Sequence, residues 1–245
     1  IAERDADWGG RVLKESQRPG LPSWRRVRDY RVWALSQMGN VSMFTNSELD
    51  PDAIQNFGAD HIALATGAHW TRHLYSALEI PITPLTMPQV FTPDDVFAGK
   101  VTGDRLLVFD FDHYYLGGVI AEHLAIGGKQ VTYATPAGHA SAWTFMTNEL
   151  PFVYQALARE DVAIHTTTNL ISFDGTQATV ANLFNQTALE LAVDGIVIVG
   201  HRAPNDALYE ALITSTESSK NESSVSLVGD AQAPGAIVHA VHSGH

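Results

Sequence analysis

Two aspartates and a tyrosine stand at the spacing of the three glycines in a dinucleotide-binding turn. In the fingerprint G-x-G-x-x-G, the glycines let the backbone approach the pyrophosphate and let the helix pack close to the strand. Asp110, Asp112 and Tyr115 occupy these three places here. Two carboxylates would repel two phosphates, and the phenol side chain would block the close approach of the helix. We therefore predict that no NAD(P) binds at this turn.

The same turn allows two further interpretations. In one, Asp110 and Asp112 cap the following helix, whose positive end favours negative side chains by about 1 kcal/mol each. In the other, Asp112, His113 and Tyr114 form an acid-base site, because His and Tyr beside a carboxylate can move protons. The residues alone leave both interpretations open, and neither provides for a nicotinamide cofactor.

The residues around the turn predict a strand, a helix and a second strand. An apolar run at 106–109 indicates a strand, and a helical pattern at 116–126 ends at Gly127-Gly128. A second apolar run at 131–134 then predicts a strand parallel to the first. This arrangement is typical of the first unit of a nucleotide-binding α/β sheet.

The composition indicates a globular chain with an excess of acidic residues. The 245 residues are 45% hydrophobic, which is enough for one large domain or two ordinary ones. No apolar run reaches the ~20 residues of a membrane helix and no leader pattern opens the chain, so we expect a soluble, cytoplasmic protein. The net charge of -12 disfavours nucleic acid and anionic membranes as partners. Without cysteine, this chain cannot hold a zinc-thiolate site or a cysteine-bound iron-sulfur cluster.

The basic residues gather near the start of the chain. Eight of the fifteen fall between Arg4 and Arg31, and several lie in a helix predicted for 24–38 with Ser23 as its cap. They interleave with aromatic residues, as in surfaces that stack bases and bind phosphate. Because the net charge is acidic, we interpret this helix instead as a solvated arginine face with its aromatic rings packed inward.

The first residues have the pattern of the end of a strand. Apolar Ile1 leads to acidic Glu3, and in dinucleotide folds an acidic residue at the end of the second strand binds the ribose hydroxyls of adenosine. The Gly9-Gly10 turn is able to lie against such a ligand, although an ordinary surface loop fits it equally well. We expect the first strand, its glycine loop and its helix to lie upstream of Ile1, and the helix that begins at Ala236 to continue beyond His245.

Six sequence blocks occur in an order that resembles a known family. They are AERDADWGGRV, PGLPSWRRVRDYR, FGADHIALATGAHW, DFDHYYLGGVIAEHLA, DGIVIVGHRAPNDALYEAL and LVGDAQAPGAIVHAVHSGH. The set looks like the C-terminal portion of the trimethylamine dehydrogenase family, which includes dimethylamine and histamine dehydrogenases and N-methyl amino acid demethylases. The similarity covers nearly the whole chain. DHYYLGG combined with the RDYR helix is specific, whereas ATGA and GD occur in many flavoprotein reductases.

The resemblance implies an α/β fold with two nucleotide-binding-like lobes of the Rossmann type, similar to FAD- and NAD(P)-binding domains. The first lobe comprises residues 1–100 and 205–245 and would bind FAD or ADP. The second, residues 101–204, is inserted in the first and carries the degenerate fingerprint. The chain is expected to be truncated at both ends.

The resemblance also implies where the nucleotide lies. In the family the ATG turn, here Thr66-Gly67, lies beside the adenosine diphosphate, and an Asp at the end of the last strand points to the ribityl or pyrophosphate region. The implied cofactor-binding residues are Glu3, Arg4, Gly9, Gly10, Arg11, Thr66, Gly67 and Asp230. No catalytic residue and no metal site is expected on this chain, because His239 and His242 have no third ligand near them in sequence.

The enzyme implied by the resemblance oxidatively demethylates a small N-methylated amine or amino acid. An upstream barrel would hold FMN and an iron-sulfur cluster, and electrons would pass to an electron-transfer flavoprotein. The enzyme would be a homo-oligomer, and this segment alone would be inactive. Two alternatives stay open, a non-catalytic assembly module with a vestigial nucleotide site and an NAD(P)H-dependent flavoprotein reductase lobe.

Overall fold

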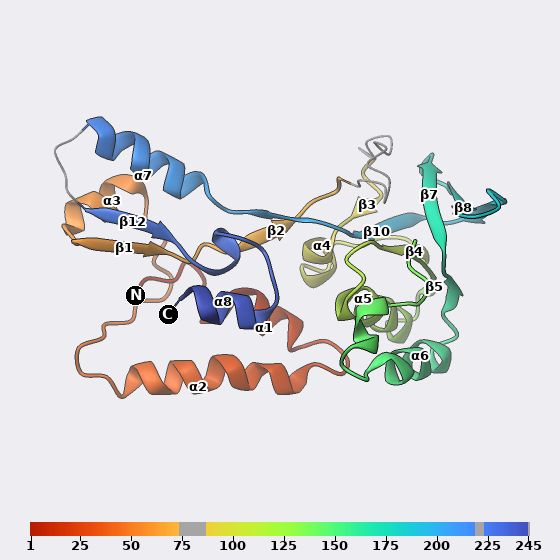
Figure 1. Cartoon of the computed structure of the whole chain (residues 1–245), viewed down its shortest axis with the longest axis horizontal. Helices are drawn as coiled ribbons and strands as arrows, with labels where there is room; N and C mark the ends of the chain where they lie inside the picture. The colour runs from red at the N-terminus through yellow and green to blue at the C-terminus, as the bar shows by residue number, and fades with distance from the viewer. Residues whose placement is uncertain (74–86, 219–222, 245) are drawn as a thin grey trace. The chain divides into compact units, whose positions relative to one another are not determined.

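A computed structural model describes residues 1–73, 87–218 and 223–244, and it divides the chain into two compact units (Figure 1). Unit 1 consists of residues 1–17, 21–69 and 202–245. Unit 2 consists of residues 18–20 and 70–201. Unit 2 thus begins well before the boundary expected at residue 101, because strand β3 (Val90–Phe91) pairs with β10 (Gly195–Val199) in the sheet of unit 2. The chain returns to unit 1 at residue 202, close to the expected position.

Unit 2 is built on a parallel sheet of five strands in the order β3-β10-β4-β5-β6. The other three strands are β4 (Arg105–Asp110), β5 (Gln130–Ala134) and β6 (Ala163–His165). All of β10 and nearly all of β4 is buried, as expected for strands covered on both faces. The predicted strand-helix-strand unit is confirmed. The alternating pattern at 163–167 predicts a short antiparallel strand, but β6 pairs in parallel with β5 at the sheet edge.

Helices cover one face of this sheet and a small antiparallel sheet covers the other. The helices are α4 (Pro93–Phe97), α5 (Tyr115–Ile126) and α6 (Leu150–Arg159). The antiparallel strands are β7 (Thr168–Phe173), β8 (Gln177–Asn182) and β9 (Ala188–Ala192). Because a strand is pleated, successive side chains of β4 point to opposite faces of the sheet. Leu106 and Val108 belong to the core on the helix side, and Leu107 and Phe109 to the core on the other side.

Unit 1 contains a smaller sheet in which β1 (His61–Leu64) pairs in parallel with β12 (Ser224–Leu227). The expected strand end at Ile1–Glu3 pairs with Phe44, whose carbonyl oxygen accepts from the N–H of Glu3 at 2.8 Å. The sequence of residues 41–45 predicts a strand, of which the structure keeps this single bridge. The remaining strands, β2 (Ala68–Trp70) and β11 (Arg202–Pro204), pair where the chain passes between the units.

The helices of unit 1 are α1 (Gly10–Glu15), α2 (Arg25–Ser36), α3 (Pro51–Phe57), α7 (Ala207–Ser218) and α8 (Ile237–Ser243). Short 3-10 turns are η1 (Pro22–Trp24) and η3 (Gly229–Ala231) in unit 1 and η2 (Ala142–Phe145) in unit 2. The polar, serine-rich residues 215–224 predict a loop, which is wrong for its first part because α7 extends to Ser218. Residues 219–222 and most of the proline-rich segment expected at 73–93 lie outside the described residues.

Helix α2 does not pack its aromatic rings inward, contrary to the expectation. None of its residues is buried, and Tyr30 and Trp33 are 66% and 61% exposed. The side chain of Arg28 takes the inward position instead, since a Cβ atom at Gly9 would come within 2.6 Å of its Cγ. Its Nε also donates to the Trp8 carbonyl oxygen at 2.8 Å. The expected Ser23 cap is absent as well, because α2 follows directly on η1 and its cap residue Trp24 makes no side-chain cap bond.

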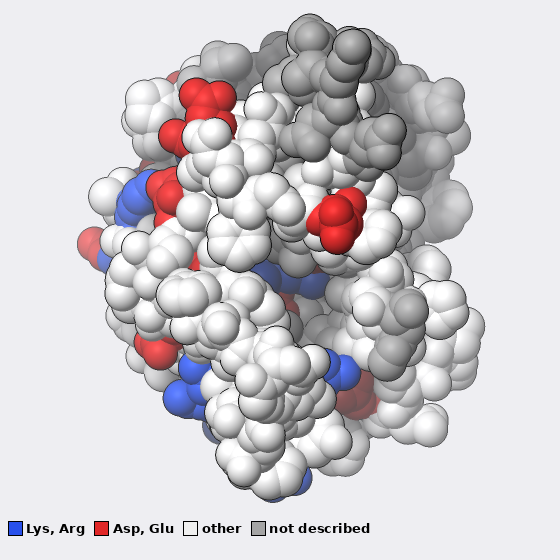
Figure 2. Space-filling view, turned by 90° about the vertical axis from the view of Figure 1, so that its left-hand side faces the viewer, with Lys and Arg blue, Asp and Glu red and all other residues white. Residues whose placement is uncertain are grey.

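Figure 2 shows basic and acidic side chains interspersed on the face that it draws, with large uncharged areas between them. On α2, Arg25 and Arg28 both form ion pairs with Asp29. Within the described ranges, no helix combines the length and the apolar composition needed to cross a bilayer.

The close approach of strand and helix in unit 2 occurs at Gly117 in the first turn of α5. A Cβ atom there would lie 2.5 Å from the Asp110 carboxyl carbon, a distance that real side chains do not tolerate. Tyr115 was expected to prevent this approach. That expectation is wrong, because Tyr115 packs beside the helix-side core and leaves the glycine to face the strand.

Gly117→Ala tests this contact. Alanine normally stabilises a helix by up to about 1 kcal/mol relative to glycine, but overpacking against a fully buried carboxyl group costs roughly 1–3 kcal/mol. We expect a net loss in the free energy of unfolding measured with urea. Gly39→Ala is the control, since nothing lies within 4 Å of its Cβ position. Equal stability of both variants would show that the strand and the helix can move apart.

Candidate functional site

Three glycines of unit 1 that were predicted to face a nucleotide have left-handed backbone. Their φ angles are 115° for Gly9, 48° for Gly10 and 74° for Gly67. Nothing lies within 4 Å of the Cβ positions of Gly10 and Gly67, so a ligand can approach the backbone at both. Gly9 differs, because Arg28 fills the space beside it. Gly10 and Gly67 are therefore better candidates than Gly9 for backbone contact with a ligand.

Glu3 and Arg4 follow the strand end that pairs with Phe44. The carboxylate of Glu3 is partly buried, and its Oε1 accepts from the N–H of Asp5 at 3.0 Å. The Arg4 side chain is exposed and pairs with Asp5 at 3.3 Å. Such a surface pair contributes little to stability. Glu3 thus keeps one carboxylate oxygen outside this contact, and its predicted role toward a ribose stays a prediction.

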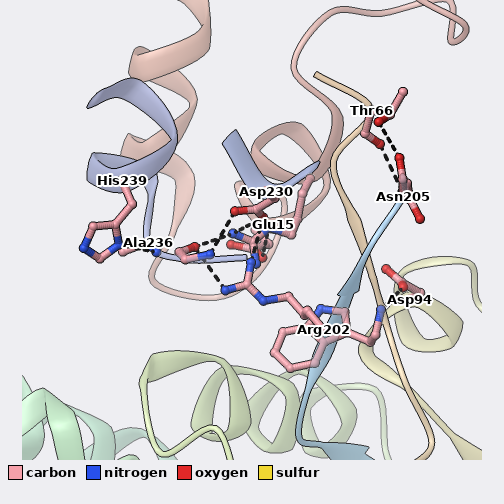
Figure 3. A network of polar contacts seen from close by, with 11 residues as sticks. Glu15, Thr66, Asp94, Arg202, Asn205, Asp230, Ala236 and His239 are labelled. Carbon is pink, nitrogen blue, oxygen red and sulfur yellow. Dashed lines mark hydrogen bonds and ion pairs between the residues drawn. The ribbon is translucent and has the colours of Figure 1, made fainter. Parts of the chain in front are cut away.

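The Thr66-Gly67 turn is held by Asn205 (Figure 3). The hydroxyl group of Thr66 donates to the Asn205 carbonyl oxygen at 2.6 Å, and Asn205 Nδ2 donates to the Thr66 carbonyl oxygen at 3.0 Å. The N–H of Asn205 donates to the Gly67 carbonyl oxygen at 2.9 Å. The Thr66 hydroxyl therefore uses its hydrogen within the protein, and its contribution to a ligand site would be the shape of the turn.

Asp230 accepts hydrogen bonds from Arg202 and from the Gly235 N–H and forms an ion pair with Arg11 (Figure 3). Its Oδ2 lies 2.7 Å from Arg202 Nη1 and 3.2 Å from Arg11 Nη2. Its Oδ1 accepts from the N–H of Gly235 at 3.0 Å. Both arginines also donate to the Gly235 carbonyl oxygen, at 3.0 Å and 3.3 Å. Asp230 and the loop after it are therefore fixed to α1 and β11 by charged hydrogen bonds.

Glu15 completes a network of two positive and two negative side chains. It is 1% exposed, and its Oε1 lies 3.5 Å from Arg11 Nε. With Arg202 and Asp230 the group is electrically balanced, so it adds little net positive potential for a diphosphate. Of the predicted site residues, Arg11 and Asp230 are thus brought together, whereas Glu3, the glycine turns and Thr66 contact other partners.

The sequence reasoning missed Glu15, Arg202 and Asn205. Glu15 had a local signal, since it lies four residues after Arg11 on one helix face. Arg202 and Asn205 had none, because their partners lie far away in sequence. No group of three or more His, Cys, Asp or Glu side chains in the described ranges is placed to hold a metal.

In unit 2, the turn with the degenerate fingerprint begins at Asp110, whose side chain points into the protein. Its carboxyl group is fully buried, and it accepts from the hydroxyl of Tyr133 on β5 and from the N–H of His113 at 3.0 Å. Tyr133 Oη in turn accepts from the N–H of Ser141 at 2.9 Å. Burial, and to a lesser extent the charge of Asp112, raises the pKa of Asp110 to about 7.

This arrangement contradicts the capping interpretation. The cap residue of α5 is Tyr114, which makes no side-chain cap bond, and Asp110 belongs to the strand. For the acid-base interpretation, His113 Nδ1 lies 3.3 Å from Thr135 Oγ1, and burial lowers the pKa of His113. Burial also raises the pKa of Tyr114. That interpretation stays a hypothesis, with Tyr133 as the partner that the sequence reasoning overlooked.

Asp110→Asn should change how stability depends on pH. Because the folded state raises the pKa of Asp110 from 3.8 to about 7, the stabilisation linked to this group is full below pH ~4 and is lost as the pH rises to about 7. The loss amounts to up to about 4 kcal/mol. The amide does not titrate, so urea midpoints of the variant should vary less across this range. Its overall stability should be lower, because its NH2 group must face either Tyr133 or the N–H of His113.

Asp174→Asn is the control for that measurement. Hydrogen bonds from Thr176 and Gln177 lower the pKa of its exposed carboxyl group, so it titrates below the tested range. A wild-type slope in Asp110→Asn between pH 4 and 7 would contradict a neutral Asp110.

Arg202→Met should destabilise unit 1 by about 3 kcal/mol, because it leaves the largely shielded Asp230 with one cation fewer. The matched control is Arg105→Met, which breaks a more exposed pair with Asp194 and should cost clearly less. Urea unfolding followed by circular dichroism measures both. Equal losses would show that the Arg202 network adds no more than a surface pair.

The chain was compared with protein-family models, with known proteins and with solved structures. No family model matches the chain. Dimethylamine dehydrogenase from Hyphomicrobium sp. (strain x) is 26% identical over 270 residues, which cover 97% of this chain and 36% of the relative.

Two solved structures match over the full length of the chain. The 6-hydroxypseudooxynicotine amine oxidase from Pseudomonas geniculata N1 is 35% identical with a TM-score of 0.95, and histamine dehydrogenase from Rhizobium sp. 4-9 is 32% identical with a TM-score of 0.93. The chain covers 37% and 38% of these proteins, so it spans little more than a third of the relatives that it matches. By sequence and fold, the chain corresponds to the C-terminal part of the trimethylamine dehydrogenase family, as the six sequence blocks predicted.

Proposed function

We propose that this chain forms the adenine-nucleotide-binding part of a flavin-dependent amine oxidoreductase, with ADP or FAD held in unit 1. The observation that carries the proposal is the open backbone at Gly10 and Gly67, both in left-handed conformation with nothing within 4 Å of the Cβ position. Glycine is the residue that lets a diphosphate come this close to the main chain. The similarity to amine dehydrogenases and an amine oxidase over the whole chain supports the enzyme class.

In this proposal each residue of unit 1 has a limited task. Glu3 accepts hydrogen bonds from the ribose hydroxyls through the carboxylate oxygen that Asp5 does not use. Gly10 and Gly67 give backbone access, with Arg4 at the rim and Gly9 shaping the turn against Arg28. Thr66 sets the second turn through Asn205. Asp230 and Arg11 act together, because Arg11 and Arg202 orient the Asp230 carboxylate while the Gly235 N–H fixes its other oxygen.

The remaining parts of the proposal concern the larger enzyme. We infer an upstream barrel with FMN and an iron-sulfur cluster, oxidative demethylation of a small N-methylated amine, and an electron-transfer flavoprotein as acceptor. A cytoplasmic location and a homo-oligomeric state belong to the same proposal. What supports it is the resemblance of the six sequence blocks together with relatives about 2.7 times as long as this chain, as their coverage of 36–38% implies.

One observation favours a second candidate, a non-catalytic assembly module with a vestigial nucleotide site. Asp230 forms ion pairs with Arg11 and Arg202, and Arg11 also pairs with Glu15, so the predicted ligand Asp230 has a structural role within the protein. Against the third candidate, an NAD(P)H-dependent reductase lobe, stands Asp110, whose buried carboxyl group replaces the first fingerprint glycine and bonds Tyr133. We expect no NADH turnover by this chain.

Binding of ADP and FAD to the purified chain tests the proposal. Denaturation followed by chromatography and absorbance detects a co-purified nucleotide, and calorimetry measures the affinity for added ADP or FAD. Glu3→Ala removes a charged acceptor worth about 1.5–3 kcal/mol, so we expect about 10- to 100-fold weaker binding. Glu190→Ala is the control, because this glutamate bonds Gln177 in unit 2. A wild-type chain that binds neither nucleotide would favour the assembly module.

A further inference from the structure

Residues 18–20 form a short turn that belongs to unit 2, although the chain on both sides of it belongs to unit 1. Pro19 and Gly20 make the turn, with a left-handed φ of 73° at Gly20. The chain therefore passes between the two units four times, at 17/18, 20/21, 69/70 and 201/202. Two of these four passages depend on how residues 18–20 are held on unit 2.

The side chain of Arg18 contacts two helices of unit 2. Its Nη1 lies 2.9 Å from Nε2 of His123, which stands in the last turn of α5. Its guanidinium carbon lies 5.2 Å from the centre of the Phe97 ring on α4, within the distance at which an aromatic face attracts a cation. Arg18 and His123 are both partly shielded from solvent. These contacts join the turn to the helices that cover the parallel sheet.

The contact with Arg18 requires a neutral His123. A guanidinium group has five N–H donors and no acceptor, and it stays protonated in proteins. Nε2 of His123 must therefore accept the hydrogen bond, which leaves the ring hydrogen on Nδ1. A second proton on the imidazole would occupy Nε2, remove the acceptor and bring two positive groups together. Uptake of one proton by His123 thus breaks this contact.

The surroundings of His123 add no acidic side chain that would favour its charged form. Burial, and then the charge of Arg18, lowers the pKa of His123 from its ordinary value. The other charged and titratable groups on and around α5 interact with groups other than His123. They are Asp94, Asp95, Arg105, Asp110, Glu122, Lys129, Tyr133, Arg159 and Glu160. In the part of the chain that the structure describes, Arg18 is therefore the charged group that acts on this imidazole.

We propose that Arg18 and His123 form a pH-sensitive latch, which holds residues 18–20 on unit 2 while His123 is neutral and releases them when His123 takes up a proton. Because the contact needs the neutral ring, the latch is closed above pH ~6.5 and opens progressively below it. With the turn released, the chain passes between the units twice instead of four times. The turn lies between α1 and α2 in the chain, so its release loosens the link between these helices and unit 2.

A spin label beside the turn tests the release. The chain has no cysteine, so the exposed position of Gln17 can carry a single nitroxide label after Gln17→Cys. We expect electron paramagnetic resonance spectra to show restricted motion at about pH 8 and faster motion as the pH falls from about 7 to about 5. His123→Gln should keep the motion restricted throughout, because its carboxamide oxygen can accept from Arg18 and does not titrate. His165→Gln is the matched control, since this histidine lies on β6, and it should leave the pH-dependent change in place.

A double-mutant cycle of Arg18→Met and His123→Leu measures the contact itself. In urea unfolding of unit 2 at about pH 8, the two changes should be coupled by roughly three- to tenfold in the unfolding equilibrium constant. At about pH 5 the coupling should vanish or reverse, which a contact with a purely structural role would not show.

Three results would overturn the proposal. They are a label whose motion does not depend on pH, a pH-dependent change that persists in His123→Gln, and a coupling that is the same at both pH values. None of these variants alters a residue proposed to bind the nucleotide, so the latch and the proposed function fail independently.

Discussion

A fully buried carboxyl group needs hydrogen-bond donors and a neighbour small enough to admit it, and this requirement organises unit 2. Asp110 receives its donors from Tyr133 on the adjacent strand and from the His113 backbone, while Gly117 leaves room for it at the start of α5. The same tyrosine fixes Ser141 and hence the η2 turn. The carboxyl group that replaces the first fingerprint glycine thus connects a strand, a helix and, through Tyr133, the start of η2.

In unit 1 the shielded carboxylates are paired with arginines. Glu15 and Asp230 are shielded from solvent, and Arg11 and Arg202 compensate their charges. Removing either cation would leave a carboxylate without a full set of partners, which is far more costly than losing an exposed ion pair. Gly10 and Gly67, whose Cβ positions are open, take no side-chain part in this network.

The elements were predictable where a local pattern specified them. The strand, helix and strand around Asp110 follow from apolar periodicity, and α3 follows from the Asp50 cap and the left-handed Gly58. The partners of the polar side chains could not be predicted from local patterns. Pairs such as Arg202 with Asp230 or Tyr133 with Asp110 join residues far apart in sequence, so they depend on the fold. The exposed rings of α2 were mispredicted for the same reason, since the space against Gly9 went to Arg28. The six sequence blocks located the predicted site residues in unit 1, but only coordinates show which of them contact one another.

The parallel pairing of β1 with β12 joins residues 61–64 to residues 224–227. Unit 2 is almost continuous along the chain, so its sheet can assemble once residue 201 has left the ribosome. Unit 1 must wait for the last strand to be synthesised before its two halves can meet. During translation, β1 therefore presents an unpaired edge while the inserted unit is already folding, and this interval is when the nascent protein is most exposed to aggregation.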